Sequence, residues 1–213
     1  MFISGCEGIE YLWWIEDCVA SLNNLYLNEL PNLSVLFKFR PTDIVSCFSL
    51  KHLQVTKCGN VKHLFTLELV KYHLQNLQTI YLHDCSQMED IIVAAEVEEE
   101  GEDINEMNNL LLYFPNLQSL ELRNLPELKS IWKGTMTCNL LQQLIVLDCP
   151  NLRRLPFSVC ITDGDAERRA STSLLKQIIV HEEWWNRTHI LMQNLFFNPN
   201  FYQKNFSNYL FPK

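Results

Sequence analysis

The chain is poor in glycine, in long apolar segments and in positive charge. Only 6 of its 213 residues are glycine, and no glycine-rich phosphate loop is present. No run of about 18 uncharged apolar residues occurs, so the sequence predicts no membrane-spanning helix. Lys and Arg number 17 against 25 Asp and Glu, which gives a formal net charge of -8. This acidic balance argues against nucleic acid or an anionic membrane surface as the main partner.

Motifs that build a catalytic or metal centre are also missing. The sequence contains no serine nucleophile elbow, no H-E-x-x-H and no C-x-x-C pair. The segment around Asp163 and Asp165 lacks the third acidic ligand and the terminal Glu of a calcium loop. The sequence therefore predicts a protein that is not an enzyme and that binds no cofactor and no metal.

The N-terminal segment and the cysteines favour an intracellular protein. Residues 1–11 contain Glu7 and Glu10 but no basic residue, which is unlike a secretory signal. The eight cysteines form no zinc-site clusters, and several of them recur at one position of the repeat described next. We interpret them as structural thiols of a reducing compartment. The predicted location is the cytoplasm, with the nucleus as the second location.

A recurring motif dominates the sequence. It reads L-x-x-L-x-L-x-x-(C or L)-x-x-L, which is the leucine-rich-repeat pattern. Complete copies begin at Leu22, Leu50, Leu77, Leu117 and Leu141. The L-x-L core of each copy has period two, which indicates a short strand with aliphatic side chains on one face. A single repeat cannot bury these side chains, so the strands are expected to stack in parallel.

The two ends of the pattern are irregular. A weaker sixth copy begins at Leu175 and carries Glu183 where the others have Cys or Leu. At the N-terminus, Ile3, Cys6 and Ile9 reproduce only the second half of a repeat, so the chain is expected to start inside one and to be a fragment. Together the copies predict strand positions at Ile3, Leu27, Val55, Leu82, Leu122, Val146 and Val180.

These observations predict an α/β repeat solenoid. The expected architecture is a leucine-rich-repeat horseshoe with a parallel sheet on its concave face and a mostly irregular or short helical convex side. The predicted domain covers residues 1–189, with about six to seven repeats, an acidic loop insertion at 93–109 and a second loop insertion at 162–172. Residues 190–213 form an aromatic tail, either a cap over the last repeat or an extension from a misread gene model.

The residues between the buried strand positions are predicted to line the concave face. One row contains Tyr26, Gln54, Tyr81, Glu121, Ile145 and Ile179. The second row contains Asn28, Thr56, His83, Arg123, Leu147 and His181. Tyr, His and Arg beside exposed aliphatic residues are typical of a protein-recognition surface, so we predict a protein partner.

The amino-acid sequence of the repeats resembles that of plant disease-resistance receptors of the coiled-coil, nucleotide-binding, leucine-rich-repeat class (NBS-LRR). The resemblance lies in the segment from Phe114 to Trp132 (FPNLQSLELRNLPELKSIW), in Phe48 to Cys58 (FSLKHLQVTKC), in LQTIYLHDC at Leu77 and in EEWW from Glu182 to Trp185. It implies a C-terminal repeat region that senses pathogen effectors, directly or through a guarded host protein, and restrains a nucleotide-binding domain until triggered. No residue of that nucleotide-binding switch is present in this sequence.

Three other functions stay open. The chain is alternatively a non-functional remnant or decoy, which substitution of Tyr81, His83 and Arg123 without effect would favour. A repeat-type adaptor of a ubiquitin ligase requires an F-box, which the sequence lacks. An enzyme ranks last, and detectable ATP hydrolysis by the purified chain would support it.

Overall fold

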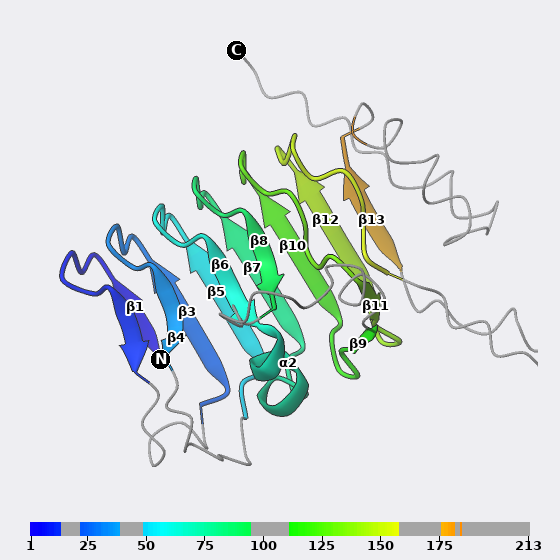
Figure 1. Cartoon of the computed structure of the whole chain (residues 1–213), viewed down its shortest axis with the longest axis horizontal. Helices are drawn as coiled ribbons and strands as arrows, with labels where there is room; N and C mark the ends of the chain where they lie inside the picture. The colour runs from blue at the N-terminus through cyan, green and yellow to red at the C-terminus, as the bar shows by residue number, and fades with distance from the viewer. Residues whose placement is uncertain (14–21, 39–48, 95–110, 158–175, 182–183, 185–213) are drawn as a thin grey trace, which may run out of the picture.

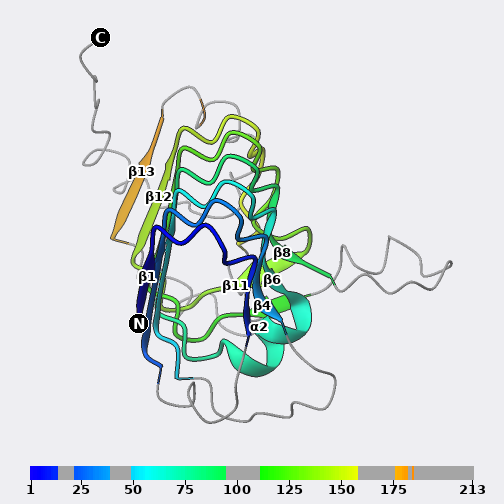
Figure 2. The same cartoon turned by 90° about the vertical axis from the view of Figure 1, so that its left-hand side faces the viewer.

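A computed structural model describes residues 1–13, 22–38, 49–94, 111–157, 176–181 and 184. In these residues the chain winds as a solenoid, with one long parallel sheet on one side and shorter return elements on the other (Figures 1 and 2). The long sheet has the order β1-β3-β5-β7-β10-β12-β13. Its strands are β1 (Phe2–Ser4), β3 (Asn24–Asn28), β5 (His52–Thr56), β7 (Thr79–His83), β10 (Ser119–Arg123), β12 (Gln143–Leu147) and β13 (Gln177–Val180). The predicted parallel-sheet solenoid is confirmed.

The register of the long sheet confirms the predicted strand positions. Ile3 pairs with Leu27, and the same row continues through Val55, Leu82, Leu122, Val146 and Val180. Leu27, Val55, Leu82 and Leu122 are completely buried. Each strand therefore contributes its L-x-L pair to one continuous core between the two sides of the solenoid, at about 1.5–3 kcal/mol for each buried side chain before entropy is subtracted.

A tight turn follows each strand. Its first residue lies in the left-handed region, with φ between 49° and 56° at Glu29, Lys57, Asp84, Asn124 and Asp148 and a φ of 66° at Gly5. In this conformation the backbone N–H of Glu29 donates to the carbonyl of Thr56 at 3.0 Å, and Lys57 donates to His83 in the same way. The turn thus extends the ladder by one hydrogen bond per strand.

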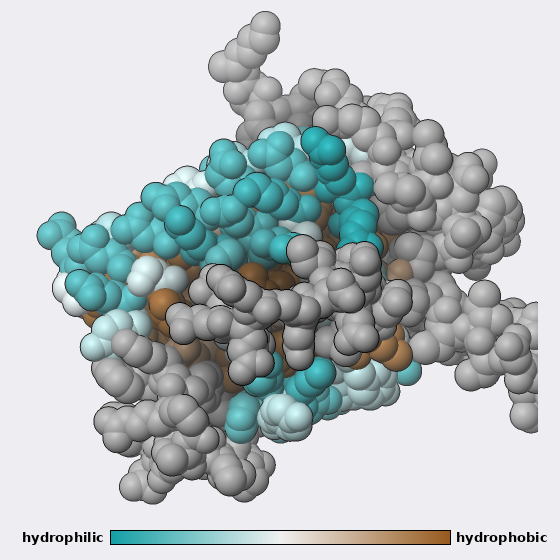
Figure 3. Space-filling model, in the orientation of Figure 1, coloured by the Kyte–Doolittle hydropathy of each residue, from teal (hydrophilic) through white to brown (hydrophobic). Residues whose placement is uncertain are grey.

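A β-turn then reverses the chain. It begins at the position that the repeat pattern gives as Cys or Leu, as in Leu30, Leu125 and Cys149. The N–H of Leu33 donates to the Leu30 carbonyl at 3.2 Å, and equivalent bonds join Leu128 to Leu125 and Leu152 to Cys149. Pro31, Pro126 and Pro150 occupy the second position of such turns, where the fixed φ of proline fits and no backbone donor is needed. In Figure 3 these turns lie in the hydrophilic band along the upper edge.

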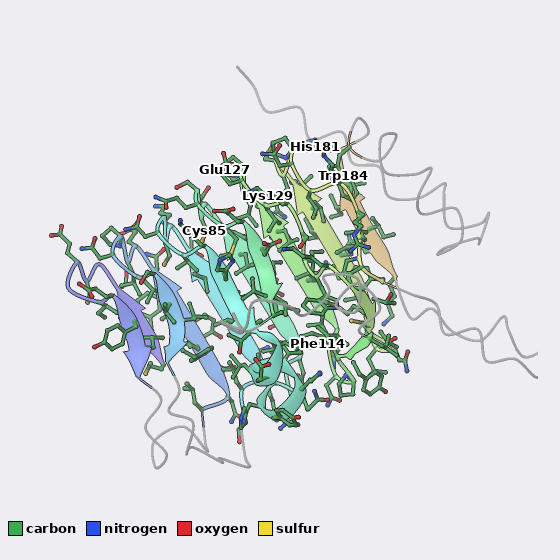
Figure 4. The ribbon with its side chains drawn as sticks, viewed as in Figure 1. Cys85, Phe114, Glu127, Lys129, His181 and Trp184 are labelled. Atoms are coloured by element: carbon green, nitrogen blue, oxygen red, sulfur yellow. The ribbon has the colours of Figure 1, made fainter. Side chains whose placement is uncertain are left out.

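The recurring cysteines lie beneath these turns. Cys58, Cys85 and Cys149 are buried, and Figure 4 shows Cys85 inside the solenoid near the end of its strand. The thiol of Cys85 donates to the carbonyl of His83, two residues back, at 3.4 Å. Cys58 and Cys149 make the same contact with Thr56 and Leu147. This crowded corner accommodates the small cysteine side chain, whose thiol donates a weak hydrogen bond.

The return side contains more regular structure than the sequence predicts. Three two-stranded parallel sheets pair β2 (Tyr11–Trp13) with β4 (Val35–Lys38), β6 (His63–Thr66) with β8 (Asp90–Val93), and β9 (Leu111–Tyr113) with β11 (Thr135–Thr137). Between the coils of β7 and β10, the buried Ser130 donates its hydroxyl to the buried carboxylate of Asp90 at 2.6 Å. The return segments therefore also stack coil on coil.

The short helix α2 (Leu67–His73) matches the predicted short helical character of this side. Thr66 caps its N-terminus by accepting a hydrogen bond from the N–H of Leu69 at 3.4 Å. Glu68 in the first turn and Lys71 in the last turn complement the helix dipole. Leu67, Leu69 and Val70 face the core, which leaves Tyr72 exposed to solvent.

Two predicted insertions and the tail lie mostly or wholly outside the described residues. The acidic insertion predicted at 93–109 begins at Val93, the last residue of β8, and it lies outside the described residues from position 95 onward. Residues 162–172 and 190–213 are likewise outside the described ranges. Trp184 is described and buried, and its indole N–H donates to the Leu152 carbonyl at 2.7 Å, beside the last coils (Figure 4).

Candidate protein-binding face

The candidate site is the outward side of the seven-stranded sheet, which we call the open face. Its two predicted rows lie in register across the strands. The middle row contains Tyr26, Gln54, Tyr81, Glu121, Ile145 and Ile179. The outer row contains Asn28, Thr56, His83, Arg123 and Leu147, with His181 following the end of β13. Neighbouring strands lie about 4.8 Å apart, so the rows form an extended surface rather than a pocket.

The sequence analysis missed part of this face. The strands extend one alternation further toward their N-termini and add a third row, formed by Asn24, His52, Thr79, Ser119, Gln143 and Gln177. Strand β1 also adds Phe2 beside Tyr26 and Ser4 beside Asn28. The period-two pattern contained this information, because the residues two positions before each middle-row residue must share its face.

The third row contains no Asp, Glu, Lys or Arg, and hydrogen bonds connect several of its side chains. His52 Nδ1 lies 2.7 Å from Thr79 Oγ1, and the Ser119 hydroxyl donates to the Gln143 side-chain oxygen at 3.0 Å. The Gln143 amide donates in turn to Gln177 at 2.7 Å. These contacts hold the polar side chains in defined positions along one edge of the open face.

A charged cluster occupies the centre of the face. Glu121 lies between His83 on β7 and Arg123 on its own strand, with His83 Nε2 3.0 Å from Glu121 Oε1 and Arg123 Nε bonded to the same oxygen. The side chain of Glu121 is only 14% exposed, whereas that of Arg123 is 38% exposed. Tyr81 stands beside Glu121 in the register. Of the twelve predicted residues, His83, Glu121 and Arg123 are thus joined by side-chain contacts, and Tyr81 is their neighbour in the register.

The electrostatics of the cluster favour an ionised Glu121. The His83 imidazole, and after it the Arg123 guanidinium, hold the pKa of Glu121 below its ordinary value, although partial burial acts in the opposite direction. The carboxylate fixes the direction of the Arg123 side chain and leaves the outer part of the guanidinium available to a partner.

An ion pair and two further polar contacts also mark the rim between the open face and the turns. His181 Nε2 lies 3.2 Å from Asp148 Oδ1, and Lys57 Nζ lies 2.9 Å from Glu29 Oε1. The Asn124 amide donates to the Asp84 carboxylate at 2.6 Å. These exposed pairs connect neighbouring turns and contribute little net stability.

The apolar side chains at the two ends of the open face differ in how far they are exposed to solvent. At the β1 end the face is aromatic and open, with Phe2 69% exposed and Tyr26 36% exposed. At the β12 end the sequence prediction was wrong about exposure, because Ile145 is 4% exposed and Leu147 is 7% exposed. Both side chains point away from the coil core. They are aliphatic, so their burial is energetically favourable.

Four thiols of the described coils are unsuited to nucleophilic chemistry because they are shielded from solvent. Burial raises the pKa of Cys85 and that of Cys149 to about 12, and it also raises the pKa values of Cys58 and Cys138. Within the described ranges, no three His, Cys, Asp or Glu side chains converge as metal ligands would. Nor does any helix of those ranges have the length and apolar character needed to cross a membrane.

A parallel solenoid with an L-x-L strand in every coil and an outward face of variable composition is a leucine-rich-repeat domain. The family model for plant disease resistance protein RPS2-like leucine-rich repeats matches residues 13–75 and 50–164, which is more than half of the chain. The chain therefore belongs to this family of plant disease-resistance leucine-rich repeats.

Similar full-length proteins carry the same description. The probable disease resistance protein At5g47260 of Arabidopsis thaliana is 24% identical over 207 residues, covering 85% of this chain and 21% of that protein. The probable disease resistance protein At4g27220 of the same plant is 29% identical over 155 residues, covering 72% of this chain and 15% of that protein. The chain thus spans about a fifth or less of these relatives, and no solved structure matches it significantly.

Proposed function

We propose that this chain is a protein-recognition module of plant defence that binds its partner through the open face. In this proposal it acts in the cytoplasm, or also in the nucleus, as the effector-sensing and autoinhibitory repeat region of an immune receptor, without enzymatic activity. The partner is a pathogen effector or a guarded host protein, and in a complete receptor also the nucleotide-binding domain of the same protein.

One observation supports this proposal most directly. The inward strand positions carry aliphatic residues in every coil, whereas the outward positions beside them carry Tyr, His, Glu, Arg and Ile on a fixed backbone. The core does not require this outward variety, because the outward side chains do not pack into it. Aromatic residues and Arg are the residues that contribute most to protein interfaces.

The central cluster gives this surface a definite chemistry. Arg123 is held by Glu121 and remains partly exposed, and Tyr81 offers an aromatic ring and a hydroxyl next to it. Holding the guanidinium in place before binding reduces the entropy lost when a partner is bound. A partner with a carboxylate or a backbone carbonyl opposite Arg123, flanked by apolar contacts, matches this arrangement.

The test compares three versions of the chain in extracts of infected and uninfected host tissue. The first is the unaltered chain, the second carries Tyr81→Ala, His83→Ala and Arg123→Ala, and the third carries Tyr72→Ala and Leu111→Ala on the return side. Quantitative mass spectrometry measures the proteins that each immobilised version retains. We expect a partner that the first and third versions retain and that the second retains at least about tenfold less, which corresponds to about 1.4 kcal/mol.

The other outcomes separate the alternatives. If the open-face variant retains every protein as well as the unaltered chain does, the recognition proposal is wrong and a remnant or decoy is favoured. If the return-side variant alone loses the partner, the binding surface lies on the side of α2. ATP hydrolysis by the purified chain that survives removal of contaminating activities would overturn the non-enzymatic assignment.

A further inference from the structure

The return side of the β10 and β12 coils carries a group of positive charges, which we call the basic patch. It consists of Lys133, Arg153 and Arg154, and all three residues are exposed. Lys133 precedes β11, and the two arginines lie in the segment after β12, which pairs with β11 through Phe157 and Met136. Within the residues that the structure describes, none of the three cations forms an ion pair.

Two hydrogen bonds join the coils that carry the patch. The Arg154 guanidinium donates to the carbonyl of Trp132 at 3.5 Å, so it lies against the residue that precedes Lys133. At the turn before the two arginines, the Asn151 amide donates to the Pro126 carbonyl of the preceding coil at 2.7 Å. Strands of consecutive coils lie about 4.8 Å apart, so one ligand can reach cations on both coils.

The acidic side chains of the neighbouring coils compensate a different cation. The Lys129 ammonium donates to the Glu89 carboxylate and holds the pKa of that group below its ordinary value. Glu127 also acts on Lys129, and Figure 4 shows both residues near the upper edge of the coils. The buried carboxylate of Asp90 accepts the hydroxyl of Ser130. The positive charge of the basic patch is therefore available to a partner.

The chemistry of the patch favours an acidic segment of a protein. A guanidinium binds a carboxylate through two parallel N–H···O bonds, and Arg153 and Arg154 offer two such groups side by side in the sequence. A long polyanion, such as nucleic acid or an anionic membrane, would also meet the rest of a chain whose formal net charge is -8. A short acidic segment contacts the patch alone and avoids most of this repulsion.

We propose that Lys133, Arg153 and Arg154 form a second binding surface, which takes an acidic segment of a partner protein. Figure 2 shows β11 on the opposite side of the solenoid from the seven-stranded sheet, so the open face and the basic patch can be occupied at the same time. This surface goes beyond the proposed function and does not depend on it.

The test measures binding of a fluorescein-labelled octa-glutamate peptide to the purified full chain. Fluorescence anisotropy at about 50 mM salt keeps the screening length long enough for surface charges to contribute. The patch variant combines Lys133→Gln, Arg153→Gln and Arg154→Gln. We expect its dissociation constant to be at least about tenfold higher than that of the unaltered chain, because three charge-assisted contacts are lost.

A matched control removes the same number of charges elsewhere. It combines Lys51→Gln, Lys71→Gln and Lys176→Gln, all at exposed positions on other elements. Its net charge equals that of the patch variant, so a general electrostatic effect would weaken both equally. We expect its dissociation constant to rise less than about twofold.

A second variant separates binding from folding. Lys133→Gln with Arg153→Gln leaves the hydrogen bond of Arg154 to Trp132 intact, and it should raise the dissociation constant about threefold. Circular dichroism melts of all variants establish that the solenoid is still folded. Equal affinities of this variant and the unaltered chain, with both folded, would count against the patch.

Four results would overturn this inference. The unaltered chain binds no octa-glutamate, or the patch and control variants lose affinity equally. An eight-nucleotide DNA strand or phosphatidylserine vesicles bind the patch more tightly than octa-glutamate does, which would assign it to phosphate groups. The open-face variant loses the peptide while the patch variant keeps it, which would place acidic segments at Arg123 and leave the proposed function intact.

Discussion

The two faces of the seven-stranded sheet use the same backbone for different purposes. On β5, Leu53 and Val55 are fully buried, while Gln54 between them is half-buried and faces outward. On β10, Leu120 and Leu122 enclose Glu121 in the same way. The inward positions specify the solenoid, and the outward positions are available for recognition because they contribute little to the core.

Substitutions at adjacent positions of β5 should show the largest difference between the faces. We expect Leu53→Ala to lower the free energy of unfolding by about 2–5 kcal/mol, because it removes buried methyl groups and leaves a cavity. Gln54→Ala, one residue away, should change it by less than about 0.5 kcal/mol. Urea denaturation of both variants measures this, and equal losses would contradict the assignment of the two faces.

The left-handed turn residues should give an intermediate effect. Asn124 has a φ of 49°, and its amide donates to Asp84. Asn124→Val and Asn124→Gly both remove that hydrogen bond, but only Val is strained at positive φ. Asn124→Val is therefore expected to be less stable than Asn124→Gly by about 1–2 kcal/mol. Thermal denaturation of the pair provides the comparison, and indistinguishable melting points would show that the turn conformation differs in solution.

The smallest effect should come from the outward charge cluster and should depend on pH. Because the folded-state pKa of Glu121 is lowered, its carboxylate stabilises the fold above the unfolded value of about 4.3. That contribution is lost as the pH falls through the folded-state pKa. Glu121→Gln should therefore be less stable than the unaltered chain near neutral pH, and the difference should shrink in acid. Urea midpoints measured between neutral and acidic pH check this, and a pH-independent difference would exclude the ion pair as its source.

The sequence predicts the inward face almost completely and the outward face only in part. All seven strand positions from Ile3 to Val180 were identified, because the L-x-L pattern and the Cys or Leu three residues after it fix the register. Eleven of the twelve predicted face residues lie on the outward side of the strands for the same reason, and His181 follows the end of β13. The third row, from Asn24 to Gln177, was missed because the prediction stopped at the L-x-L core, although the same alternation places the residues before it on the outward side.

Other features are not encoded locally. The return strands β2, β9 and β11 are three residues long, which is too short for an alternating pattern to be recognised. The burial of Ile145 and Leu147 was mispredicted because the exposure of an outward side chain depends on its surroundings in the folded chain, which the alternation of the strand does not encode. Contacts between distant segments determine both features.

The most direct test of the central claim places a photo-crosslinking amino acid on each face of the full chain in plant cells. One variant carries benzoylphenylalanine in place of Tyr81, on the open face, and the other carries it in place of Tyr72, which is 72% exposed on α2. We predict a protein adduct from position 81 that disappears when Arg123→Glu is added, and no such adduct from position 72. An adduct that forms only from position 72, or one from position 81 that is insensitive to Arg123→Glu, would contradict recognition through the open face.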